Sequence, residues 1–220
     1  WISIKPVDDM KILDNITNTV RDDLRVEIKK GSRVSIAAAC FSMYAYKELK
    51  KQLETIDEFE FIFTFPTFVK EKAEKQKREF YIPRISRETS LYGTEFEIKL
   101  RNEMTQRAIA KECADWIRRK ATFKSNTTGE NMAGFMTVDS GAAQTAYMPI
   151  GGFTTVDIGC ERGNNSYNMV NCMEAPFAQQ YMKLFDSLWN DRDKMQDVTD
   201  VVLEISAQLM LKIPRSSSIL

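Results

Sequence analysis

The stretch most suggestive of chemistry is residues 149–165, PIGGFTTVDIGCERGNN, which holds four of the chain's nine glycines. A glycine-rich turn can cradle a phosphate, because its backbone N–H groups converge on the anion. An ATP-binding loop also needs a lysine. Residues 151–171 contain none, and they match neither G-x-G-x-x-G nor G-x-x-x-x-G-K-[ST]. The alternative is a turn between strands in which Gly151 and Gly152 relieve close packing.

The chain has no histidine, which excludes every mechanism built on imidazole, from Ser-His and Cys-His nucleophile pairs to histidine metal clusters. Carboxylate and lysine mechanisms remain open. Asp139, Asp157 and Glu161 lie near turns and could bind magnesium in a nuclease, but carboxylates in so generic a pattern are usually solvated surface groups. The residues themselves therefore predict no catalytic group and no metal site.

The four cysteines are widely spaced, without a C-x-x-C pair. Cys40 and Cys113 lie in apolar patterns typical of small buried thiols. A structural zinc site would need closer spacing or histidines, so none is predicted.

Positive charge is concentrated in one region, although the chain as a whole has 31 basic and 31 acidic residues. The basic residues between positions 101 and 124 are Arg101, Arg107, Lys111, Arg118, Arg119, Lys120 and Lys124. Such a run is usually a solvated face, and it indicates a nucleic-acid partner only if folding gathers it into a patch. Trp116 could stack on a base there, or it could belong to the apolar stripe of its own helix.

The elements that must position these groups begin with a helix over residues 19–30, which Thr19 and Asp22 cap at its start. The apolar run 33–41 predicts a buried strand, residues 42–56 a helix that begins at Ser42, and residues 58–65 a second strand. Strand, helix and strand in this order predict a parallel βαβ unit.

The rest of the chain alternates helices and short strands. A charged helix and an extended piece are predicted over 68–84, a loop over 86–94, and a long amphipathic helix over 96–119. The predicted strands are 121–126, 131–139, 144–150 and 166–174, and helices follow over 176–190 and 198–212. With 220 residues, no apolar run long enough for a bilayer and no secretory signal, we expect one cytoplasmic domain without membrane contact.

Long runs of the sequence resemble one known family. They are SIAAACFSMYAYKELKKQL with FEFIFTFPTF, then REFYIPR with SLYGTEFEIKLRNEMTQRAIAKECADWIRRKATFKSN, then AYMPIGGFTTVDIGCERGNN. These runs resemble the N-terminal region of bacterial Swi/Snf-type ATP-dependent helicases, where a phospholipase-D-like domain precedes the motor. The resemblance implies an α/β fold, an α/β/α sandwich with a mixed, largely parallel sheet and C-terminal helices. It implies one such domain over residues 1–195 and a helical segment over 196–220 that leads towards a missing motor.

The resemblance also explains the glycine stretch. Active phospholipase-D enzymes carry H-x-K, an aspartate and a G-S-x-N turn, and they need two copies of the motif. Here GFMTVD occupies the place of the first motif without histidine or lysine, and IGGFTTVDIG occupies the place of the turn. Gly151, Gly152, Thr154 and Thr155 are thus expected to form a degenerate phosphate turn without hydrolytic activity.

The implied function is that of a non-catalytic accessory module of a DNA helicase or translocase. It would bind or position nucleic acid, expected to be DNA, through the basic residues between 101 and 124, beside the motor domains of the same protein. No cofactor is expected in this segment, since ATP and magnesium would belong to the parent motor. The alternative is a protein-interaction module, such as one that forms a homodimer.

Overall fold

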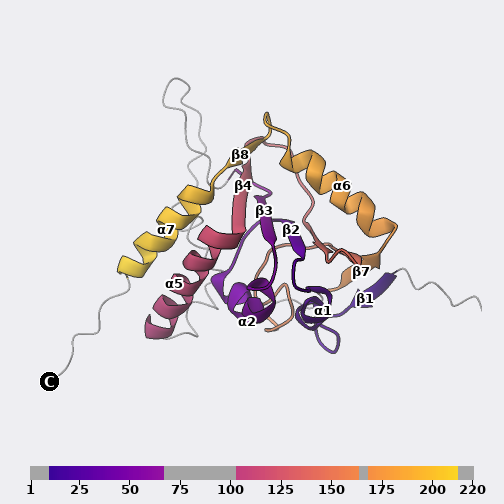
Figure 1. Ribbon diagram of the computed structural model, residues 1–220, viewed down its shortest axis with the longest axis horizontal. Helices are drawn as coiled ribbons and strands as arrows, with labels where there is room; N and C mark the ends of the chain where they lie inside the picture. The colour runs from indigo at the N-terminus through magenta and orange to yellow at the C-terminus, as the bar shows by residue number, and fades with distance from the viewer. Residues whose placement is uncertain (1–9, 67–102, 164–167, 213–220) are drawn as a thin grey trace, which may run out of the picture.

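The computed structural model describes residues 10–66, 103–163 and 168–212, and Figure 1 shows their path. The expectations for residues 68–84 and 86–94, and for the first residues of the long helix, lie outside the described residues. The strands are β1 (Met10–Leu13), β2 (Arg33–Ala38), β3 (Glu58–Phe63), β4 (Ala121–Asn126), β5 (Phe135–Asp139), β6 (Gln144–Met148), β7 (Val170–Glu174) and β8 (Met195–Asp197). The helices are α1 (Val20–Glu27), α2 (Met43–Leu53), α5 (Glu103–Lys120), α6 (Phe177–Trp189) and α7 (Thr199–Lys212).

One mixed sheet of eight strands runs through the molecule in the order β1-β7-β6-β5-β2-β3-β4-β8. The predicted α/β class and the predicted βαβ unit are confirmed, because β2 and β3 pair in parallel around α2. Parallel pairing extends only to β3 and β4, whereas every other neighbouring pair is antiparallel. The sheet is therefore mixed but not largely parallel, because only two of the seven neighbouring pairs among the described strands are parallel. The four-residue connection between β5 and β6 is too short for a parallel crossover.

The two N-terminal helices begin where the sequence predicts. Thr19 caps α1 by accepting a hydrogen bond from the Asp22 amide, and Ser42 caps α2 by accepting one from the Tyr44 amide. Each cap satisfies an amide that the first helical turn leaves without a partner. Both helices bury their apolar stripes against the same face of the sheet.

Helices cover both faces of the sheet, as expected for an α/β/α sandwich. In Figure 1, α6 lies on one side, while α1, α2, α5 and α7 lie on the other. The larger core lies under these four helices, and α6 closes a smaller one with Phe185 against Ala37, Ile62 and Phe135.

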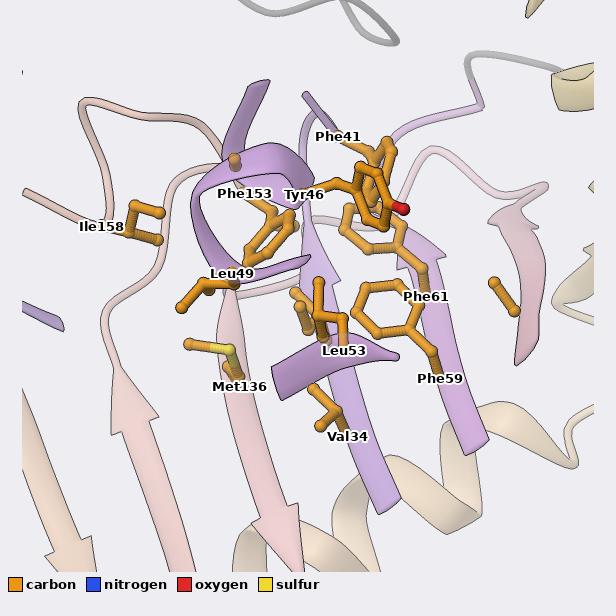
Figure 2. Packing of buried hydrophobic residues seen from close by; sticks show 14 of the residues in the cluster. Val34, Phe41, Tyr46, Leu49, Leu53, Phe59, Phe61, Met136, Phe153 and Ile158 are labelled. Carbon is orange, nitrogen blue, oxygen red and sulfur yellow. The ribbon is translucent and has the colours of Figure 1, made fainter. Parts of the chain in front are cut away.

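Aromatic side chains fill the centre of the larger core. Phe41 packs edge-on against Phe59, Phe61 and Phe123, with ring centroids 6.0, 5.7 and 5.2 Å away, and it stacks on Phe153 at 5.7 Å. Figure 2 shows Phe41, Phe59, Phe61 and Phe153 side by side. These contacts join the residues after β2 to β3, β4 and the glycine stretch, so the core itself fixes the position of that stretch.

An ion pair between the buried Glu60 and the partly exposed Arg33 links the sheet to α6. The Glu60 carboxylate of β3 is 5% exposed and accepts a hydrogen bond of 2.8 Å from Nε of Arg33 on β2. Ser35 Oγ donates to the same carboxylate at 3.1 Å, and Arg33 Nη2 reaches Asp186 of α6 at 2.7 Å. Burial raises the pKa of Glu60, while the Arg33 guanidinium opposes that rise. Arg33 therefore joins β3, through Glu60, to α6, through Asp186.

The predicted domain boundary at residue 195 falls inside one packed unit. β8 spans that position and pairs with β4, and Val198 and Val202 lie in the larger core. Helix α7 packs on α5 and β4. Residues up to 212 therefore belong to the same body as the sheet.

Candidate functional site

The glycine stretch lies at the carboxyl end of β2, where the chain leaves the sheet for α2. The Ala39 amide donates to the Gly151 carbonyl at 3.0 Å, and the Phe153 amide donates to the Cys40 carbonyl at 2.8 Å. Ser42, the N-cap of α2, donates its amide to the Phe153 carbonyl at 2.8 Å. Residues 151–153 thus run beside residues 39–42 as an extension of the sheet.

The two threonines of the predicted phosphate turn are buried, with exposures of 2% for Thr154 and 0% for Thr155. Thr154 Oγ1 donates to Asp157 Oδ2 at 2.5 Å and accepts from the Asp157 amide at 3.1 Å. Thr155 Oγ1 donates to Glu161 Oε2 at 3.1 Å. Both hydroxyls therefore face carboxylates of their own turn, and this negative environment opposes a phosphate.

Gly152 is required by close packing, which is the alternative that the sequence suggests. A Cβ atom on this residue would lie 2.5 Å from Cys40 Sγ and 2.8 Å from Asp157 Oδ2. Real Cβ atoms do not approach other heavy atoms so closely, so a larger residue would force the side chains of Cys40 and Asp157 to move.

The other side of the turn packs against the start of α1. The Arg21 amide donates to the Ile158 carbonyl at 2.8 Å, and the Val20 amide donates to Asn15 Oδ1 at 2.9 Å. With Thr19 as N-cap, protein acceptors thus occupy the first amides of α1. The end of this helix that could attract an anion already has its partners.

Asn15 joins the two segments and adopts a left-handed conformation with φ 54°. Its Nδ2 donates to the carbonyls of Asp157 at 2.9 Å and Asn168 at 3.1 Å.

We expect Asn15→Ala to lower the free energy of unfolding by about 2–3 kcal/mol. The substitution removes both hydrogen bonds, and alanine tolerates the left-handed backbone conformation less well than asparagine does. Urea denaturation measures the change. A matched Asn190→Ala variant, which removes one exposed bond to Asp186, should lose less than about 1 kcal/mol.

The basic residues predicted to bind nucleic acid divide between several environments. Arg101 lies outside the described residues, and Arg107 is half-buried on α5. Arg118 pairs with Asp115 at 2.7 Å, and Arg119 pairs with Glu54 at 3.0 Å. Lys120 Nζ donates to the Ile56 carbonyl at 2.8 Å, and Lys111 is exposed without an ion pair to another described residue.

Lys124 is separated from this group by the sheet. It lies on β4 next to Phe123, which faces the larger core, so the Lys124 side chain points to the opposite face. There Nζ donates to the Trp189 carbonyl at 2.7 Å and lies 4.3 Å from the centre of the Trp189 ring. Lys124 thus anchors the end of α6. Trp116 is also structural, because it is fully buried and donates Nε1–H to the Leu53 carbonyl at 2.9 Å.

Helix α2 adds basic residues that the sequence did not single out. Helices α2 and α5 pack together, and between them they carry eight basic and four acidic side chains. Lys47 and Lys50 approach the same carboxylate, Glu112, at 3.7 and 2.9 Å, and Lys51 is exposed. We call the outward basic side chains of these two helices the α2–α5 surface; they are Lys47, Lys50, Lys51, Lys111, Arg118 and Arg119. The sequence could have revealed the lysines of α2, because they lie on the polar face of the amphipathic helix predicted over residues 42–56.

The three carboxylates considered for magnesium do not gather. Asp139 ends β5 beside Arg33 of β2, whereas Asp157 lies near Cys40, beyond the opposite end of β2. Within residues 10–66, 103–163 and 168–212, no three Cys, Asp or Glu side chains are placed to hold a metal ion. Burial raises the pKa of the Cys160 thiol to about 12 and raises the pKa values of Cys113 and Cys172, so these cysteines are poor nucleophiles at neutral pH.

No family model and no curated protein matches the chain. Among solved structures, it is similar to the phosphatidylserine synthase of Haemophilus influenzae Rd KW20, with 11% identity and a TM-score of 0.45. The match covers 93% of this chain and 46% of the synthase chain, so the present chain spans about half of that protein. A similarity this low assigns neither a family nor an activity. Among the described helices, none is long and apolar enough to cross a bilayer.

Proposed function

We propose that this chain is a non-catalytic module that binds the phosphate backbone of nucleic acid, DNA in particular, through the α2–α5 surface. In this proposal it positions DNA for an ATP-dependent helicase motor in the same protein. The excess of basic over acidic side chains on α2 and α5 is the observation that supports binding. The connection to a motor comes from the sequence resemblance. The proposed lack of hydrolysis rests on the same resemblance, because GFMTVD, at the place of the H-x-K motif, holds neither histidine nor lysine.

The ion pairs on this surface are compatible with DNA binding. Arg118 and Asp115 are 52% and 53% exposed, and exposed pairs of this kind contribute about 0–1 kcal/mol. A DNA phosphate can therefore replace the carboxylate at small cost. Each cation that contacts a phosphate releases a condensed counterion, which makes the binding salt-dependent and indifferent to sequence.

The test compares two variants with the same change in net charge. Lys51→Gln, Lys111→Gln and Arg118→Gln together should weaken duplex binding at least tenfold at about 50 mM salt. The slope of log K against log salt concentration should also become shallower by about three. Fluorescence anisotropy with a labelled duplex measures both quantities.

The matched control replaces Lys29, Lys30 and Lys183, which are exposed on other parts of the molecule, with glutamine. It should change the affinity less than threefold. Equal losses in the two triple variants would mean that net charge, rather than this surface, drives binding. Undetectable binding of the unmodified chain at low salt would refute the nucleic-acid proposal.

A second candidate function is self-association through β1. This strand forms one edge of the sheet, and Met10 and Ile12 on it are each 53% exposed. Exposed apolar residues on an edge strand favour pairing with another strand. Sedimentation equilibrium tests the idea: a dimer that dissociates in the Ile12→Lys variant supports it, and a monomer at high concentration excludes it.

A further inference from the structure

A cavity of about 540 Å³ lies at the end of the sheet opposite the glycine stretch. It is formed where the β5–β6 turn, the end of β7, the start of α6 and the last residue of α1 meet. Its lining comprises Glu27, Gln144, Thr145, Glu174, Gln179 and residues 141–143 and 175. This volume lies within the range of small-molecule sites in proteins.

The lining contains two carboxylates and no basic side chain. Glu27 comes from α1, and its Oε2 accepts a hydrogen bond of 3.2 Å from Thr145 Oγ1. Glu174 is the cross-strand partner of Thr145, so both side chains project from the same face of the sheet. Two negative groups from separate elements therefore border one hollow.

Two further features favour a cation. Glu27 is the last residue of α1, and the carboxyl end of a helix carries partial negative charge. Lys11 of β1 forms an ion pair with Asp23 and also interacts electrostatically with Glu27, but it does not line the cavity. The side-chain amides of Gln144 and Gln179 in the lining add acceptor oxygens and carry no positive charge.

We propose that this cavity binds an organic cation through an ammonium or guanidinium group. The carboxylates of Glu27 and Glu174 would accept charge-assisted hydrogen bonds from it, and the amide oxygens of Gln144 and Gln179 would accept further ones. The cation is either a small polyamine-like molecule or the side chain of a lysine or arginine on a partner protein. The site is independent of the proposed nucleic-acid surface, so either proposal can fail without the other.

The experiment uses three probes, agmatine, spermidine and a blocked tripeptide with one central arginine, each titrated into the whole chain by calorimetry at about 50 mM salt. Glu174→Gln and Glu27→Gln should each weaken binding of the preferred probe at least fivefold, and together they should abolish it. The double variant Glu130→Gln with Glu204→Gln removes the same charge elsewhere and should stay within twofold. Preference for the free amines or for the peptide identifies the source of the cation.

Several outcomes would overturn the proposal. They are the absence of saturable binding for all three probes, unchanged binding in the Glu27 and Glu174 double variant, or an equal loss in the control. Tighter binding of magnesium chloride, with displacement of the organic probe, would make this an inorganic cation site instead. Glu174 is exposed, so its variant should fold, and it keeps the test decisive even if Glu27→Gln unfolds.

Discussion

Arg33→Met should lower the free energy of unfolding by about 3–5 kcal/mol at pH 7, because it leaves the Glu60 carboxylate buried without its cation. Glu60 is 4% exposed, and the Ser35 hydroxyl that would still donate to it is neutral. Urea denaturation followed by circular dichroism measures the loss. Arg25→Met is the matched control, since Arg25 is 40% exposed and pairs with Asp22 and Glu48 at the surface; it should cost about 1 kcal/mol or less.

A second substitution tests the electrostatic cause. Arg33→Met combined with Glu60→Leu removes both charges, so the double variant should recover at least half of the lost stability. Failure of the double variant to recover would mean that the stem of Arg33, rather than its charge, stabilises the contact with α6. A loss below about 1 kcal/mol in the single variant would contradict the buried pair altogether.

The same variant should respond to pH in a defined direction. Burial raises the pKa of Glu60 even beside Arg33, and loss of the guanidinium should raise this pKa further. A carboxyl whose pKa is higher in the folded state than in the unfolded state destabilises the fold at high pH. That cost disappears below the unfolded pKa of about 4.3. The difference between Arg33→Met and the unmodified chain should therefore be largest near pH 7 and smaller at pH 5.

Gly134→Ala should destabilise the protein by about 3 kcal/mol through a backbone clash. The added Cβ would lie 1.7 Å from the Ile150 carbonyl oxygen and 3.2 Å from the Ala37 carbonyl oxygen. Because both obstacles are main-chain atoms, no change of rotamer relieves them. The hydrogen bond of 2.9 Å from the Ile150 amide to the Gly134 carbonyl would also be displaced. Thermal unfolding of the purified variant measures the effect.

Gly129→Ala provides the control for this prediction. Gly129 lies in the same connection before β5, and an added Cβ there meets nothing within 4 Å. Its stability should stay within about 0.5 kcal/mol of the unmodified chain. Similar melting temperatures for the two alanine variants would show that residues 134 and 150 can separate freely.

Local signals in the sequence predicted most elements correctly. Thr19 and Ser42 cap their helices as their positions indicated, and the apolar run that contains β2 lies in the buried centre of the sheet. The strands β1 and β8 escaped prediction, because their four and three residues are too few to show a periodic pattern. Their partners, β7 and β4, lie far away in the sequence, so tertiary pairing rather than local propensity defines them.

The candidate sites were harder to predict for the same reason. The composition of the glycine stretch allowed both a phosphate turn and a packed corner, and only the position of Cys40 beside Gly152 reveals the close packing. The run of basic residues gave no indication that Lys124 projects to the other face, beside Trp189. It also gave no indication that the lysines of α2 lie next to α5, because this proximity results from the packing of the two helices in the folded protein.

The pairing of β1 with β7 sets an order of events for a chain that emerges from the ribosome. Met10 is among the first described residues, yet its neighbour in the sheet is Met173. The N-terminal strand must therefore wait until β7 has been synthesised before its amides find their native partners. Helices α1 and α2 can form early, but β1 joins the sheet only after β7 has left the ribosome, and until then Met10 and Ile12 are open to other strands.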